Sequence, residues 1–187
     1  KRASYINGTL SQYFAFVPVC PELAVGLGVP REPIRLVTTQ SGTRVVGTRN
    51  PTLDVTEALH DYGKRKAREM QDIAGYILKR GSPSCGMERV KVRNEQGMPR
   101  REGRGLFAEA LMHVQPDLPV EEEGRLHDPV LRENFIERVF AYRRLSSLFR
   151  GRWTRGRVIS FHTAHKLQLM AHSTVAYREL GRLVASL

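Results

Sequence analysis

Short apolar runs alternate with amphipathic segments over the first two-thirds of the chain. Apolar residues at helical spacing predict helices over residues 54–71 and 105–114, and Asp54 followed by Glu57 is typical of a capping box. Runs rich in Val, Ile and Phe predict strands over residues 14–20, 33–37, 44–48, 74–79 and 89–92. Strands and helices that alternate in this way predict a Rossmann-like, layered α/β domain.

The pattern becomes helical after the acidic run Glu121–Glu123, which is typical of a solvated connector. Asp128 and Pro129 predict a helix start, and apolar residues then recur at spacings of three and four as far as Phe149. Two more helices are predicted over residues 159–173 and 175–187.

These patterns predict two domains. The first covers residues 1–127 and is of the α/β class, and the second covers residues 128–187 and is all-α. We expect the first domain to be incomplete at its N-terminus and the second at its C-terminus.

Composition narrows the class of protein. A hydrophobic content of 41% is enough for a packed core, and no run of 18 apolar residues is present to span a membrane. Two cysteines are too few for a disulfide scaffold, so a reducing, cytoplasmic location is expected.

The net charge of +11 is concentrated toward the C-terminus. Residues 126–187 hold 11 Lys and Arg against four Asp and Glu, whereas residues 1–125 hold 19 against 15. Arginine with interleaved aromatic residues suits contact with phosphates and bases, although a solvated basic linker or a segment that docks the two domains explains the pattern too. The candidate residues for contact with an anion or nucleic acid are Arg143, Arg144, Arg150, Arg152, Trp153, Arg155 and Arg157.

Both cysteines follow predicted strands. Cys20 ends the first apolar run before Pro21, and Cys85 lies in the glycine-bounded loop of residues 81–87. Ligands gather at the carboxyl ends of strands in α/β sheets, so the two thiols can meet in space and bind a soft metal. Two thiolates alone are a weak metal signal, and two unrelated, partly buried thiols remain an alternative.

Three histidines lie within one predicted helix. His162, His165 and His172 fall within an arc of about 80° on one face at 100° per residue. His162 and His172 lie about 15 Å apart along the axis, too far to share one metal ion. We therefore expect hydrogen bonding at a helix interface, or contact with an anion beside Lys166, and no metal.

Several segments resemble a known family. VPVCPELAVGLGVPREPIRLV, GYILKRGSPSCGMERVKV and GLFAEALM resemble the 2-thiouracil desulfurase family, formerly a domain of unknown function. LRENFIERVFAYRR and FHTAHKLQLMAHS resemble the helical YbgA-type domain that is often fused behind it.

The resemblance implies a 4Fe-4S cluster held by three cysteines, with one iron open to accept the sulfur of a thiolated base without net redox chemistry. Two of the three family cysteines match Cys20 and Cys85. The third belongs to a family motif upstream of Lys1-Arg2, so we expect a preceding segment to supply it.

The exchange of C=S for C=O needs an acid/base group and an oriented water. Glu22, two residues after Cys20, is the candidate acid/base, and Ser82 and Ser84 are candidates to orient substrate or water. The simpler alternatives are an ion pair of Glu22 with Arg31 or Arg35, and serines that cap the turn.

The leading hypothesis is a cluster-dependent desulfurase that acts on a small thiolated nucleobase. The alternative is a module that binds or modifies nucleic acid, such as thiolated tRNA, through the Arg-rich helical domain. A third hypothesis is a structural domain that binds zinc.

Overall fold

The computed structural model describes residues 6, 8–94 and 96–187. The chain divides into two compact units, residues 1–139 and 140–187, and α5 (Pro129–Arg150) passes through the division. The predicted domain boundary at residue 127 stays a prediction, and Lys1-Arg2 lies outside the described residues. None of the helices in the described part of the chain is both long and apolar enough to cross a membrane.

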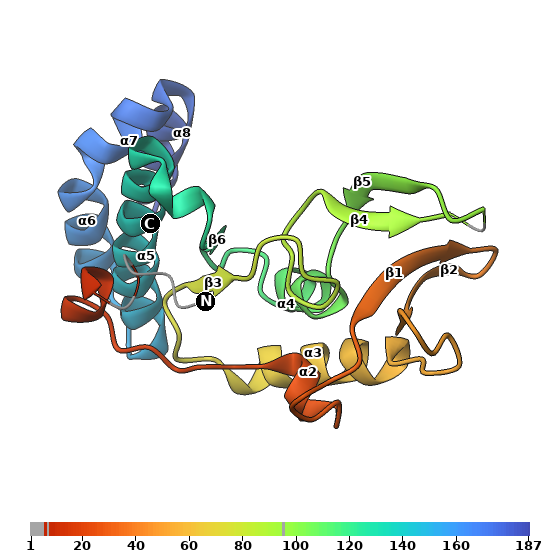
Figure 1. Ribbon diagram of the computed structural model, residues 1–187. Coiled ribbons are helices and arrows are strands. Elements are labelled where there is room, and N and C mark those ends of the chain that lie inside the picture. The colour runs from red at the N-terminus through yellow and green to blue at the C-terminus, as the bar shows by residue number, and fades with distance from the viewer. Residues whose placement is uncertain (1–5, 7, 95) are drawn as a thin grey trace. The chain divides into compact units, whose positions relative to one another are not determined.

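A mixed sheet of four strands forms the core of the first unit. Its order is β2 (Gly42–Gly47), β1 (Ile34–Thr39), β4 (Val90–Arg93) and β5 (Pro99–Gly103), and only the β1–β4 pair is parallel. Alternation decides which face is buried: Val90 and Val92 are buried, whereas Lys91 and Arg93 are exposed. Figure 1 shows α3 (Thr56–Glu69) and α4 (Leu106–Val114) beside this sheet.

The two helices pack closely because of a glycine. A Cβ atom at Gly63 in α3 would lie 2.8 Å from the Cβ of Ala110 and 3.3 Å from the Cα of Phe107, both in α4. Helices can approach this closely only where one lacks a side chain. This close packing on α3 holds α4 in position. The first turn of α4 in turn supports the loop that carries Cys85.

The start of α3 differs from the predicted capping box. Val55 is the N-cap residue, and Asp54 Oδ1 instead accepts a hydrogen bond of 2.9 Å from the backbone N–H of Thr56. Thr56 Oγ1 in turn accepts one of 2.9 Å from Val45 N–H in β2. The helix start is therefore tied to the sheet, which a local signature cannot indicate.

A second, parallel pair of strands corrects the prediction for the acidic run. β6 (Val120–Glu122) pairs with β3 (Tyr76–Leu78), and Glu121 and Glu122 are buried. Glu122 Oε1 accepts a 2.9 Å hydrogen bond from Met87 N–H, and Glu121 Oε1 lies 2.7 Å from Arg125 Nε. The predicted solvated connector is therefore wrong, because the Glu121 and Glu122 carboxylates are buried and have partners within the protein.

Four of the five predicted strands are confirmed. The prediction for residues 14–20 is wrong: the segment is not in a strand, Phe16 and Val17 are exposed, and Pro18 cannot donate to a strand ladder. The sequence missed β5 because its charged residues are those of an exposed edge strand rather than a buried one.

The second unit is helical, as predicted, but with different boundaries. The helix expected over residues 159–173 is two, α6 (Arg155–Ala164) and α7 (Lys166–His172), followed by α8 (Thr174–Ala185). The break falls at His165, which is the C-cap of α6 and the N-cap of α7.

The helix break at His165 contradicts the prediction that His162, His165 and His172 lie on one face of a single helix. His162 and His165 are buried and His172 is exposed. His165 Nδ1 lies 2.8 Å from the carbonyl oxygen of Phe161 and its ring stacks on that residue at 4.1 Å. The His162 ring is nearly parallel to that of Tyr177 in α8. His162 therefore packs between α6 and α8, whereas His165 bonds back to its own helix where α6 ends.

Candidate active site

The loop that carries Cys85 is a compact turn held by its own serine. Ser82 Oγ accepts hydrogen bonds from the backbone N–H groups of Ser84 (3.3 Å) and Cys85 (3.2 Å), and Gly86 N–H donates to Ser82 O at 2.8 Å. A Cβ atom at Gly86 would lie 2.9 Å from Ser82 O, so the turn requires glycine there. Ser82 therefore caps the turn, as the simpler reading of its role predicted.

The first turn of α4 also supports the loop that carries Cys85. The backbone N–H groups of Phe107 and Ala108 donate to Ser84 O at 3.0 and 3.2 Å. A Cβ atom at Gly105 would lie only 2.6 Å from the backbone nitrogen of Cys85. Ser84 is fully buried. Both polar groups of the peptide bond between Ser84 and Cys85 are held, the carbonyl oxygen by α4 and the N–H group by Ser82 Oγ.

The second segment of the site begins at Cys20. This residue is the N-cap of the short helix α2 (Pro21–Ala24), Pro21 occupies the first helical position, and Glu22 lies in the first turn. Pro21 is buried and anchors the segment. Proline at this position suits a helix start because its missing N–H needs no partner there.

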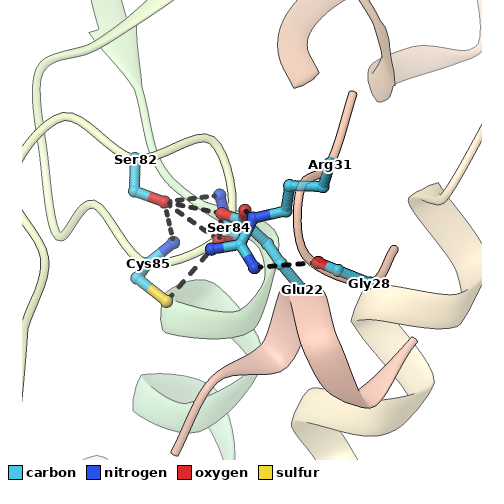
Figure 2. Close-up of polar contacts among 6 residues, drawn as sticks. All are labelled: Glu22, Gly28, Arg31, Ser82, Ser84 and Cys85. Atoms are coloured by element: carbon cyan, nitrogen blue, oxygen red, sulfur yellow. Dashed lines mark hydrogen bonds and ion pairs between the residues drawn. The ribbon is translucent and has the colours of Figure 1, made fainter. Parts of the chain in front are cut away.

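Glu22 joins the two segments. Its Oε1 accepts a hydrogen bond of 2.7 Å from Ser84 Oγ, and Ser82 Oγ lies 3.4 Å from the same oxygen (Figure 2). Its Oε2 forms an ion pair of 2.8 Å with Arg31 Nε, and Arg31 also donates to the carbonyl oxygen of Gly28. The structure therefore holds Glu22 through both oxygens, with Arg31 as its cation.

The two serines form a short chain of hydroxyl groups. Ser82 Oγ and Ser84 Oγ are 2.9 Å apart, and Ser84 Oγ is 3.6 Å from Cys85 Sγ. A hydroxyl has one proton, so Ser84 can donate to Glu22 or to the sulfur but not to both at once. The hydroxyl proton of Ser84 therefore has two alternative acceptors, the Glu22 carboxylate and the Cys85 sulfur.

Both thiols are free and partly buried. Burial raises the pKa of Cys85 to about 12, and the negative charges of Glu22 and Cys20 add to this, while the hydrogen bond from Ser84 opposes it. Glu22, two residues after Cys20, bonds to Ser84, which precedes Cys85, so the segments that carry the two cysteines meet despite their separation in sequence.

Tyr76 in β3 is a neighbour of the site that the sequence pattern did not single out. Burial raises the pKa of its phenol, and the charges of Cys85, Tyr62 and Cys20 add to the effect. Its ring packs on Phe107 with centroids 5.8 Å apart. A tyrosine in an apolar strand is typical of a core residue, so only the fold reveals that Tyr76 packs on Phe107, in the first turn of the helix that supports the loop of Cys85.

The donor type of the two thiols fits an iron–sulfur cluster. Thiolate is the usual protein ligand of such clusters, and metal binding removes the proton that burial retains on Cys85. Cys20 and Cys85 supply two ligands. Among the described residues, no three His, Cys, Asp or Glu side chains form a group that could hold a metal ion.

Some of the predicted anion-contact residues lie together in the helical unit. Arg143 and Arg144 of α5 and Arg157 of α6 line an open cavity of about 630 Å³. The cavity lining does not include Arg150, Arg152, Trp153 or Arg155. Trp153 instead makes an edge-to-face contact with Phe149, with ring centroids 6.2 Å apart.

The family comparison agrees with the resemblance over the first part of the chain. The sequence model of the 2-thiouracil desulfurase family matches residues 1–123. A solved structure of the 4Fe-4S-dependent thiouracil desulfidase TudS is 28% identical, with 70% of this chain and 81% of that chain covered and a TM-score of 0.49. A search of curated proteins gave no match. The YbgA-type resemblance of the helical region stays a prediction.

Proposed function

The chain belongs to the 2-thiouracil desulfurase family, and we propose that it replaces the sulfur of 2-thiouracil, or of a similar small thiocarbonyl compound, by oxygen. The reaction is a hydrolysis without net redox change: water supplies the new oxygen, and the sulfur leaves as sulfide with the two protons of that water. The proposed catalytic group is Glu22, assisted by Ser84 and Ser82.

The observation that carries this proposal is the contact from Glu22 through Ser84 to Cys85. Glu22 Oε1 is 2.7 Å from Ser84 Oγ, which is 3.6 Å from Cys85 Sγ. A carboxylate, a hydroxyl and a thiol from two distant segments therefore converge. Proton transfer and sulfur chemistry in one place are what desulfuration requires.

Cys20 and Cys85 are proposed to hold a 4Fe-4S cluster as two of its ligands. When bound, such a cluster supplies an iron that acts as a Lewis acid and accepts the sulfur of the thiocarbonyl group. The support in this chain is the pair of free thiols at the site, one of them within reach of the Ser84 hydroxyl.

Glu22 is proposed to take a proton from the attacking water at Oε1 and to return it as the sulfur departs. Arg31 occupies Oε2 at 2.8 Å, so Oε1 is the oxygen directed at the serines and the loop of Cys85. A general base must be oriented as well as basic, and the ion pair supplies that orientation.

The serines are proposed to keep the proton path in place. Ser84 donates to Glu22 Oε1, and Ser82, 2.9 Å away, can donate to Ser84 in turn. If Glu22 gains a proton, the hydroxyls can reverse direction, because each oxygen also accepts. Ser82 additionally holds the backbone of Cys85, so its role is both structural and chemical.

The test is the conversion of 2-thiouracil by anaerobically prepared full-length protein. We expect uracil and sulfide in equal amounts, measured by chromatography and a colorimetric sulfide assay. The Glu22→Gln variant should retain iron and lose conversion, whereas Glu69→Gln, on the exposed side of α3, should convert normally. Iron-loaded wild-type protein that releases neither product would contradict the proposal.

A further inference from the structure

The helical unit has a groove whose chemistry differs from that of the site of Cys85. The cavity of about 630 Å³ lies between the C-terminal half of α5 and the first turns of α6. Its lining residues are Arg143, Arg144, Ser147, Leu148, Thr154, Gly156, Arg157, Ser160 and Phe161. We call this cavity the arginine groove.

The arginine groove lies in a part of the chain with an excess of basic residues. The groove lining includes three arginines and no Asp or Glu. Residues 140–187 as a whole hold nine Lys and Arg and a single acidic residue, Glu179. Arginines gathered around a concavity without carboxylates create a field that attracts anions, and their planar, forked donors match phosphate oxygens.

One of the arginines is held in place by the backbone. Arg157 Nη1 donates to the carbonyl oxygen of Arg152 at 3.1 Å, and Arg157 N–H donates to Thr154 Oγ1, the N-cap of α6. A guanidinium has five N–H donors, so this contact fixes its direction and leaves donors for a ligand. Ser147 and Ser160, also in the lining, add hydroxyl groups.

The groove also has an apolar part. Leu148 is buried and Phe161 half-buried, and both belong to the lining. A free phosphate ion would leave this surface and most of the volume without contacts. The volume lies in the range of ordinary small-molecule sites, which combine apolar walls with a few polar groups.

We propose that the arginine groove binds a small organic phosphate of nucleotide size. Arg143, Arg144 and Arg157 contact the phosphate, and Leu148 and Phe161 contact the organic part. A nucleic acid would be expected to follow a longer basic surface, yet Arg150, Arg152 and Arg155 lie outside the groove. The site is separate from the proposed desulfuration chemistry and does not depend on it.

The test is calorimetric titration of the full-length protein with uridine monophosphate at about 150 mM salt, where non-specific charge effects are screened. We expect saturable binding of one ligand per chain. Inorganic phosphate should bind more weakly, because it reaches only the arginines. A single-stranded oligouridylate should bind no more tightly than the mononucleotide.

Two variants and a charge-matched control locate the site. Arg144→Gln should weaken binding roughly tenfold, and Arg144→Gln with Arg157→Gln roughly a hundredfold. The control is Arg178→Gln with Arg182→Gln in α8, which removes the same charge outside the groove and should change the affinity less than about twofold. Circular dichroism checks that each variant is folded, and Arg144→Gln is informative alone if the double variant is not.

Three results would overturn the proposal. The first is absence of binding by uridine monophosphate. The second is equal weakening by the groove variants and the control, which would mean a general charge effect. The third is much tighter binding of the oligouridylate, lost in both double variants, which would mean a nucleic-acid surface instead.

Discussion

The loop of Cys85 and the arginine groove use polar groups in opposite ways. Around Cys85 the polar side chains are small and buried, and they bond to one another: Ser84 is fully buried between Glu22 and the thiol. In the groove, Arg143, Arg144 and Arg157 are exposed. A preorganised, buried network directs individual protons, whereas exposed guanidinium groups attract charge from a distance.

Each of the two regions suits one kind of task. The site in the first unit fixes its atoms through contacts between segments 60 residues apart in sequence, such as Ser82 with Glu22. The groove is built from two consecutive helices and depends on charge rather than on a fixed network. Substitutions in the first region should therefore cost activity and stability steeply, and those in the second should not.

The largest expected effect is on catalysis by Glu22→Gln. The amide keeps the shape and can still accept from Ser84, but it cannot take a proton. We expect the rate of thiouracil conversion to fall about 100- to 10,000-fold, as for loss of a general base. The measurement is the initial rate of uracil formation, and an unchanged rate would remove Glu22 from the mechanism.

Alkylation of iron-free protein should reveal the buried thiol. Because burial raises the pKa of Cys85 to about 12, the thiol keeps its proton at pH 8, and only the thiolate reacts. In a Cys20→Ser variant we expect iodoacetamide to label Cys85 about a hundredfold more slowly than glutathione, with a rate that rises as the pH approaches 12. Labelling at the rate of glutathione would mean that the thiol is not buried.

Gly105→Ala should destabilise the first unit. The new methyl group would lie 2.6 Å from the nitrogen of Cys85, where the backbone cannot move without breaking the bonds from α4 to Ser84. We expect a loss of about 1–3 kcal/mol in the free energy of unfolding, measured by urea titration. An unchanged midpoint would show that the support of the loop is looser than described.

The smallest effect is expected for the matched change in the second unit. Gly181 lies inside α8, and a Cβ atom there would be 3.7 Å from His162 Nε2, an ordinary contact. Gly181→Ala should therefore stabilise the helix by about 0.5–1 kcal/mol through its better helix propensity. A destabilisation comparable to that of Gly105→Ala would erase the contrast between the two units.

The sequence predicted the parts of the fold that depend on local pattern. Short apolar runs predicted β1 and β4, and helical spacing predicted α3 and α4, because these signals lie within each element's own sequence. Elements stabilised by distant partners were missed. The run of Glu121 and Glu122 looked solvated because β3, which pairs with it, and Met87 N–H, which donates to Glu122, lie far away in the sequence.

The site was predicted in part for the same reason. Cys20 and Cys85 drew attention because thiols in proline- and glycine-bounded loops are unusual, and Glu22 followed from its place beside Cys20. The pairing of Glu22 with Arg31 was one of two alternatives, and only the fold decided between them. Tyr76 left no signal, because its apolar neighbours are those of any core strand.

The most direct test of a cluster at the loop of Cys85 is the iron and acid-labile sulfide content of anaerobically prepared full-length protein, measured beside a Cys85→Ala variant. We expect about four of each per chain in the wild type, as in a 4Fe-4S cluster, with both lost in the variant together with thiouracil conversion. Iron and sulfide retained in the variant, or absent from a wild type that still converts thiouracil, would contradict the claim that the loop of Cys85 is the reaction site.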